Sequence, residues 1–424
     1  MGQAARSMRW QKLLTGRVWL SAAAGLLLAL ALPKFSIEGF AWVAPGLMLA
    51  AGLGASGGGA FRAGYVAGLA FFLTSLYWLL YIPVPFAPIV GWLGLAAFLA
   101  LFPATWVWLC WRVFPTQAPP GPGRIYYEVK PSSLSRALPL DKLLLLSWGQ
   151  RLAWALGCAA FWVAWEMVQA RIFTGFPWNF LGATQYAMLP LIQISAITGV
   201  YGVSFVMAWF SVSLLCAAAV LIRQQPLTRS NALMEVILPL GVVAGLVGWG
   251  SHLLFSPAPV KEQRALTVAL IQPNIPQTTI WDPEKSIQRF QQIMVLSEQA
   301  LETAHPELVV WPEAAVPSLF LWDTNVAYRG QTIYGAITSL ARRHQIWMVI
   351  GADDAEARRD DSGEADYYNS SFLITPEGRV AATYRKQQLV IFGEYVPLSR
   401  WLPFLKDFRS EEHTSELQSR GLTS

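Results

Sequence analysis

The chain has 424 residues, of which 54% are hydrophobic and only 13% are charged. Because soluble globular proteins carry about 25% charged residues, this composition excludes an entirely water-soluble chain and predicts more than one domain. The net charge of +5 does not indicate nucleic-acid binding, since the excess lysines and arginines lie between apolar runs, where they orient membrane segments. Charges are sparse from Val18 to Ser256 and ordinary from Lys261 onward, which predicts a membrane half followed by a soluble half.

The first half is predicted to cross a membrane seven times, since each span needs about 20 apolar residues. The charge-free runs are Val18–Leu32, Phe40–Ala60, Ala63–Ile82, Phe86–Trp111, Leu152–Trp165, Leu181–Ile222 and Val236–Ser256. The sixth run is long and contains Pro190 and Gly199. We therefore interpret its first part as an interfacial or re-entrant piece and Gly199–Ile222 as its span.

The distribution of basic residues supports this number of spans. Seven spans place the Arg- and Lys-rich N-terminus and the basic connections after the second, fourth and sixth runs on one side of the membrane. The positive-inside rule makes that side cytoplasmic, so we expect everything after Ser256 on the opposite face. The stretch "TGFPWNFLGATQ" after Arg171 then also faces outward. An interfacial aromatic belt is the favoured interpretation, and a lipid-facing lip beside an active site is the alternative.

In the soluble half, the sequence predicts helices that alternate with strands at first, and then strands that follow one another directly. Strands are expected at 265–272, 307–311, 346–351, 367–375 and 380–385, and helices after Asp282-Pro283 and near 329–344. Asp282 supplies an N-cap and Pro283 a first-turn proline. Because Pro376-Glu377-Gly378 is a hairpin turn between the last two strands, we expect an α/β sandwich with a partly antiparallel sheet.

Two charged residues lie where such folds place chemistry, at the ends of strands. Glu313 follows an apolar strand, where partial desolvation raises the proton affinity of a carboxylate, and Lys386 closes another strand. Either residue alone is as well explained by a solvated strand end. The three cysteines, Cys110, Cys158 and Cys216, all lie in apolar runs and are interpreted as buried structural thiols. A disulfide framework or a zinc site is therefore excluded from the soluble half.

Three segments of the soluble half carry a resemblance. "QPNIPQTTIWDP", "VVWPEAAVP" and "YRKQQLVIFGEYVPL" together resemble the nitrilase, or carbon–nitrogen hydrolase, superfamily. With a multi-span domain in front of them, and with "GFPW" and "GVYGVSF" inside it, residues 10 to 408 resemble the apolipoprotein N-acyltransferases of bacterial inner membranes. The fold implied is a polytopic α-helical membrane domain followed by an αββα sandwich, incomplete at its C-terminus.

The resemblance also implies roles for individual residues. Glu313 is the general base that takes a thiol proton, and Lys386 stabilises the oxyanion of the tetrahedral intermediate. Glu394 is the second glutamate that orients them, and Trp281 lies near the acyl pocket. A cysteine carries the acyl chain as a thioester, and no metal or nucleotide cofactor is needed.

The implied reaction is the transfer of an acyl chain from a phospholipid to the α-amino group of diacylglyceryl-cysteine in an apolipoprotein. The expected partners are therefore the phospholipid donor, the diacylglyceryl apolipoprotein acceptor and the membrane, since both substrates lie in the outer leaflet of the inner membrane. Nucleic acid is not among the expected partners. The implied location is the bacterial inner membrane, with several spans and with the soluble domain facing the periplasm.

The expected domains are residues 1–256, the membrane domain, residues 257–408, a partial nitrilase-like domain, and residues 409–424. The resemblance places the nucleophilic cysteine several tens of residues after Lys386, but only 38 residues follow it and none is cysteine. The last segment, "RSEEHTSELQSRGLTS", is polar, without period, and similar to translated adapter sequence, the alternative being a native disordered tail. We therefore expect a C-terminally truncated chain that is inactive as given.

Two other functions remain open at this stage. A membrane-bound amidase or nitrilase acting on a small nitrogen compound would use the same residues, although seven spans exceed what a tether needs. A scaffold or transporter is weakly supported, because Arg151 is the one interior charge of the predicted spans.

Overall fold

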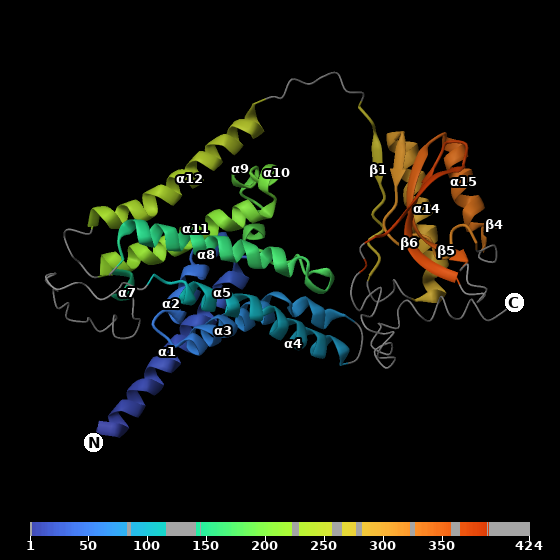
Figure 1. Cartoon of the computed structure of the whole chain (residues 1–424). Coiled ribbons are helices and arrows are strands. Elements are labelled where there is room, and N and C mark those ends of the chain that lie inside the picture. The colour runs from blue at the N-terminus through green and yellow to red at the C-terminus, as the bar shows by residue number, and fades with distance from the viewer. Residues whose placement is uncertain are drawn as a thin grey trace. The chain divides into compact units, whose positions relative to one another are not determined.

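The computed structural model describes residues 2–82, 86–115, 141–144, 146–222, 229–256, 265–276, 282–322, 327–357, 365–387 and 389. The chain divides into two compact units, Met1–Pro259 and Val260–Ser424 (Figure 1). The first unit is helical throughout its described residues, and the second contains a five-stranded sheet with helices.

The elements described in the first unit are all helices (Figure 1). They are α1 (Gly2–Leu30), η1 (Glu38–Trp42), α2 (Ala44–Gly52), α3 (Gly57–Ser75), η2 (Tyr77–Tyr81), α4 (Ala87–Leu99), α5 (Leu101–Arg112), α7 (Asp141–Leu144), α8 (Trp148–Gln169), η3 (Ile172–Thr174), η4 (Leu181–Gln185), α9 (Leu189–Ile192), α10 (Ser195–Thr198), α11 (Val200–Ile222) and α12 (Arg229–Phe255).

Five helical segments of the described residues are long and apolar enough to cross a membrane. They are Gly57–Tyr81, Pro88–Arg112, Trp148–Gln169, Val200–Leu221 and Leu233–Phe255. The predicted division of the long sixth run is confirmed, because the short helices α9 and α10 precede the long helix α11. Gly199, between α10 and α11, has a φ of +65°. Five spans confirm a polytopic membrane unit, and the other two predicted spans stay predictions.

Those two runs differ from the other five. In the first run, the apolar part of the 29-residue helix α1 is Gly16–Leu30, which is below the usual spanning length. The second run, Phe40–Ala60, is divided, since α2 ends at Gly52 and α3 begins at Gly57. Ser56 causes this division as the N-cap of α3, where its hydroxyl accepts a hydrogen bond from the amide of Gly59 at 3.2 Å.

Helix α3 packs closely against the junction of α4 and α5 through two glycines one turn apart. A Cβ on Gly64 would lie 2.5 Å from the carbonyl oxygen of Pro103, and one on Gly68 would lie 2.8 Å from the Cα of Ala100. Small residues at this spacing let helix backbones approach each other, which replaces the hydrophobic driving force that lipid does not supply.

Helices α5 and α8 are joined by a reciprocal pair of tryptophans. The indole N–H of Trp106 donates to the carbonyl of Cys158 at 2.8 Å, and that of Trp154 donates to the carbonyl of Cys110 at 3.0 Å. Both cysteines are fully buried and unbridged. Their predicted role as buried structural residues is confirmed.

Arg151 in α8 and Glu235 in α12 form a buried ion pair. The Nε of Arg151 lies 2.6 Å from Oε1 of Glu235, and Nη1 donates to the carbonyl of Leu146 at 2.6 Å. The predicted seventh span began at Val236, but the helix begins at Arg229 and includes Glu235. Arg151, the interior charge of the predicted fifth span, is thus neutralised by Glu235, which the sequence analysis placed just outside the seventh span.

The second unit is built on a sheet with the strand order β1-β2-β5-β6-β7. Its strands are β1 (Val268–Leu270), β2 (Leu308–Val310), β5 (Trp347–Ala357), β6 (Ala365–Ile374) and β7 (Val380–Arg385). The pairs β1–β2 and β2–β5 are parallel, whereas β5–β6 and β6–β7 are antiparallel, which confirms the predicted partly antiparallel sheet. A separate two-stranded ribbon joins β3 (Ala327–Tyr328) and β4 (Gln331–Thr332).

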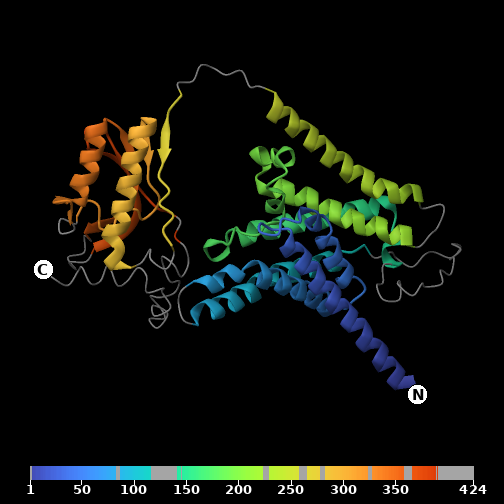
Figure 2. The same ribbon diagram turned by 180° about the vertical axis from the view of Figure 1, so that it is seen from behind.

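Two helices cover one face of this sheet, α14 (Ser286–Ala304), preceded by η6 (Pro283–Lys285), and α15 (Ile333–His344) (Figure 2). Alternate residues of β5, among them Met348 and Ile350, are fully buried in one cluster with Phe290 of α14 and Leu340 of α15. Because side chains alternate along a strand, residues such as Gly351 and Asp353 lie on the other face.

The buried ion pair gives a prediction about stability. Replacing Arg151 alone by methionine leaves Glu235 buried without its charged partner, which is expected to destabilise the first unit by about 3–5 kcal/mol. The double variant Arg151→Met/Glu235→Leu removes both charges and is expected to recover most of that loss. Thermal unfolding in detergent measures both, and a double variant no more stable than the single variant would contradict this account.

Candidate functional site

The structure brings Glu313 and Lys386 together. Glu313 follows the end of β2, and Lys386 follows the end of β7. Lys386 Nζ lies 3.1 Å from Glu313 Oε1, although 73 residues separate the two in sequence. The two residues therefore meet because of the order of the strands in the sheet, which the sequence pattern does not determine.

The backbone around Glu313 is fixed against β5. The amide of Trp311 donates to the carbonyl of Val349 at 2.8 Å, and that of Ala315 donates to the carbonyl of Gly351 at 3.0 Å. Gly351 is needed here, since a Cβ at this position would lie 2.4 Å from the carbonyl oxygen of Pro312 and 2.8 Å from the Cα of Glu313. The missing side chain makes room for the turn that carries the carboxylate.

Lys386 is held in place through its neighbour, Arg385. Consecutive strand residues point to opposite faces, so Lys386 reaches Glu313 while Arg385 reaches across β6 to β5. There Arg385 Nε donates to Asp354 at 3.0 Å, another guanidinium nitrogen contacts Glu356, and the guanidinium carbon lies 4.0 Å from the ring centre of Tyr368. The carboxylates of Glu356 and Asp354 raise the pKa of Arg385, which keeps this anchor charged.

A third residue, Asn369 of β6, belongs to the site and was missed by sequence reasoning. Its side-chain amide donates a hydrogen bond to Oε1 of Glu313, and its backbone carbonyl accepts one from the amide of Lys386 at 2.8 Å. The available signal was an asparagine inside a strand, where that residue type is depleted.

A cleft of about 250 Å³ opens beside Glu313. It is bounded by the segment after β1, the first turns of α14, the segment after β2, and β5. The lining residues are Gln272, Pro273, Asn274, Ile275, Ser286, Arg289, Ile293, Pro312, Glu313, Ala314, Ala315, Val316, Pro317, Ser318, Leu319 and Asp353. A cleft at the carboxyl ends of parallel strands is where α/β folds bind ligands.

The start of the helical segment beside this cleft is capped as the sequence predicts. The carboxylate of Asp282 accepts a hydrogen bond from the amide of Glu284 at 3.1 Å and contacts Lys285 Nζ at 3.2 Å. Lys285 lowers the pKa of Asp282, so the cap stays ionised at neutral pH. Two predicted site residues, Trp281 and Glu394, lie outside the residues that the structure describes.

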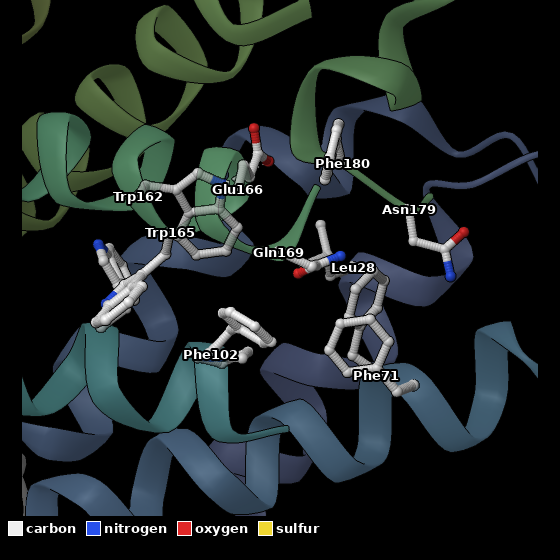
Figure 3. Close-up of a pocket in the computed structure, with 12 residues that line it drawn as sticks. Leu28, Phe71, Phe102, Trp162, Trp165, Glu166, Gln169, Asn179 and Phe180 are labelled. Atoms are coloured by element: carbon white, nitrogen blue, oxygen red, sulfur yellow. Dashed lines mark hydrogen bonds between the residues drawn. The ribbon is translucent and has the colours of Figure 1, made fainter. Parts of the chain in front are cut away.

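The first unit contains a small aromatic cavity of about 40 Å³ (Figure 3). Glu166 and Gln169 of α8 line it together with side chains that include Leu28, Phe71 and Phe102. Oε1 of Glu166 accepts hydrogen bonds from the indole of Trp162 and from the amide of Leu181, each at 2.8 Å. These contacts fix the entry to η4.

The segment between α8 and η4, with the sequence "ARIFTGFPWNF", is held by polar groups that α8 supplies. The side-chain amide of Gln169 donates to the carbonyls of Phe176 at 3.1 Å and Trp178 at 3.2 Å. The segment nevertheless presents Phe173 (71% exposed) and Trp178 (52%) at its surface. Exposed aromatic rings suit both an interfacial belt and a lipid-facing lip, and the geometry within the first unit leaves that choice open.

Within the described residues, histidine, cysteine and acidic side chains form no cluster that could hold a metal ion. The three cysteines of the chain are all buried in the first unit. The residues that meet at the site are therefore a carboxylate, an ammonium group and an amide.

Two family models match the chain. The apolipoprotein N-acyltransferase N-terminal domain matches residues 24–213, and the carbon-nitrogen hydrolase model matches residues 267–418. A curated apolipoprotein N-acyltransferase from Geobacter metallireducens is 34% identical over 398 residues, which is 91% of this chain and 66% of the relative. The chain belongs to the apolipoprotein N-acyltransferase family.

Other relatives of that family are similar over less of their length. The Brucella melitensis protein is 30% identical over 80% of this chain and 56% of its own length, and the Azotobacter vinelandii protein is 35% identical over 59% and 44%. The chain thus spans about two thirds or less of the curated relatives it matches. A carbon–nitrogen hydrolase structure from Helicobacter pylori shares 21% identity over 30% of this chain with a TM-score of 0.21, too low to bear on the fold. The relatives do not favour the alternative of a membrane-bound amidase.

The contact of Gly351 with the turn that carries Glu313 gives a second prediction. The variant Gly351→Ala is expected to lose about 1–3 kcal/mol, because the new methyl group pushes against backbone that cannot move without breaking hydrogen bonds to β5. Chemical unfolding of the purified chain measures the loss. The control is Gly91→Ala in α4, where a Cβ meets nothing within 4 Å, and equal stabilities of the two variants would contradict the prediction.

Proposed function

We propose that the enzyme to which this chain belongs transfers an acyl chain from a phospholipid to the α-amino group of a diacylglyceryl apolipoprotein, through a cysteine thioester. The observation that carries the proposal is the 3.1 Å contact between Glu313 and Lys386 at the ends of two strands, in a chain of this family. The curated relatives, named apolipoprotein N-acyltransferases, support it.

In the first half of the reaction, Glu313 acts as the general base. Both of its described hydrogen bonds, from Lys386 and Asn369, are made by Oε1. Oε2 is therefore the oxygen that takes the proton of the thiol. The thiolate attacks the ester carbonyl of the phospholipid, and the ammonium group of Lys386 stabilises the oxyanion that forms. The carbon–oxygen bond then breaks, and the leaving alkoxide of the lysophospholipid takes the proton back from Glu313.

In the second half, the amine of the acceptor attacks the thioester carbonyl. Lys386 again stabilises the oxyanion, and Glu313 takes a proton from the attacking nitrogen. The carbon–sulfur bond breaks, the thiolate is protonated, and the product is an amide. The second unit of these 424 residues contains no cysteine, so the thiol is not among them. Glu394 as the orienting carboxylate and Trp281 as a wall of the acyl pocket belong to the same proposal.

The location follows from the physical chemistry of the substrates. The chain is a membrane protein with at least five helices of spanning character among its described residues. A lipid donor and a lipid-anchored acceptor are presented at a membrane surface. We place the enzyme in the bacterial inner membrane with the second unit on the periplasmic side, on the strength of the positive-inside pattern.

The test uses the longest reading frame at the locus of this chain, reconstituted in liposomes with a diacylglyceryl lipopeptide. Mass spectrometry follows the gain of one acyl chain on the peptide. Glu313→Gln is expected to lower the rate about 10²–10⁴-fold, because it removes the base, and Lys386→Met about 10²–10³-fold, because it removes the oxyanion partner.

The matched controls are Glu377→Gln and Arg379→Gln, in and directly after the turn between β6 and β7. They remove the same kinds of charge away from the site and are expected to keep the full rate. The 424-residue chain alone is expected to give no product, since it lacks a thiol in the second unit. The proposal would be contradicted by hydrolysis of simple amides without acyl transfer, or by full activity of the Glu313→Gln variant.

A further inference from the structure

We propose that Asn369 is a positioning residue that aims one of the two carboxylate oxygens of Glu313 and fixes the backbone of Lys386. The consequence for catalysis rests on the proposed function, but the contacts and their first test do not.

The two contacts of Asn369 reach both members of the pair. The side-chain amide donates to Oε1 of Glu313, and the backbone carbonyl accepts from the amide of Lys386 at 2.8 Å. In the sheet, Asn369 pairs with Asp353 of β5. On its other side Asn369 lies opposite Lys386, the residue that directly follows the end of β7. Residues opposite each other share a face, so one strand position organises the whole pair.

The direction of the amide follows from charge. An ionised carboxylate only accepts hydrogen bonds, so the NH₂ group of Asn369, and not its carbonyl, must face Glu313. This bond and the one from Lys386 fall on the same oxygen, Oε1. The two bonds therefore leave Oε2 as the proton acceptor. Because a hydrogen bond to the charged form of an acid favours that form, removal of this donor is a change that a pH-dependent readout can detect.

Other charges also act on Glu313 and set the background against which Asn369 is measured. Among the described residues these are Lys386 from the end of β7, and Asp353 of β5 and Arg289 of α14, which line the same cleft. Lys386 and Arg289 carry positive charge, and Asp353 carries negative charge. A test must therefore change Asn369 and leave these three residues in place.

Two nearly isosteric variants do this. Asn369→Leu removes the donor, and Asn369→Asp removes it and adds a negative charge beside Glu313. The matched control is Ser371→Ala, two residues along β6 on the same face, where no hydrogen bond to Glu313 or Lys386 is found in the described structure. If the leucine variant fails to fold, the aspartate variant still carries the test.

The first readout needs no turnover and uses the chain as it is. A water-soluble carbodiimide with glycinamide modifies carboxyl groups that hold a proton, and peptide mass spectrometry reports the pH midpoint of modification at Glu313, whose side chain is 61% exposed. In Asn369→Leu the midpoint is expected to move to higher pH by roughly 0.5–1 unit, the low end for a hydrogen bond to an exposed charge. Asn369→Asp moves it further, and Ser371→Ala leaves it unchanged.

The second readout is the pH dependence of kcat/KM for acyl transfer by the longest reading frame. The acidic limb is expected to move to higher pH in the same order, whereas a merely structural role would lower the rate at every pH without moving the limb. Equal labelling midpoints in the wild type and both Asn369 variants overturn the positioning role. If the wild-type enzyme transfers no acyl chain while the Asn369 variants show shifted labelling midpoints, the proposed function is overturned and the positioning role stands.

Discussion

The antiparallel pairing of β6 with β7 is the constraint on which the site depends. It sets Lys386 opposite Asn369, and the pairing of β6 with β5 sets Asn369 opposite Asp353. A slip of one residue would send every side chain of β7 to the other face, so that Lys386 would lose Glu313 and Arg385 would lose Asp354. The anchor formed by Arg385 on the far face opposes such a slip. The register of the strands thus determines the geometry of the candidate site.

Much of this architecture was predictable from the sequence, for physical reasons that particular residues show. Apolar runs and the Pro376-Glu377-Gly378 turn predict spans and strands because burial and turn formation are local properties. The division of the second run at Ser56 was missed, since a helix cap depends on one hydroxyl and not on average hydrophobicity. Glu235 was missed because its burial depends on Arg151, a partner 84 residues away. Asn369 was missed for the same reason, because its role comes from strand register.

The two units use buried polar groups differently. In the membrane unit, Arg151 and Glu235 satisfy each other inside apolar surroundings, where an unpaired charge would be costly. Oε1 of Glu166 likewise accepts hydrogen bonds from Trp162 and Leu181. They fix helices and connections in one arrangement. At the candidate site the charged groups remain partly open to solvent, with 32% of the Lys386 side chain and 61% of the Glu313 side chain exposed. The ion pair at the candidate site is thus far more accessible than the buried pair Arg151–Glu235.

That exposure bears on how Lys386 can serve two partners. In the structure its ammonium group contacts Glu313, whereas in the proposed reaction it stabilises an oxyanion. A fully desolvated pair would hold the lysine against the carboxylate and resist this exchange. A solvent-exposed pair contributes little stability, about 0–1 kcal/mol, so the ammonium group can turn toward the developing charge at low cost. In the proposed mechanism Asn369 keeps its own hydrogen bond to Glu313 when the lysine turns, so that the carboxylate stays oriented while its partner moves.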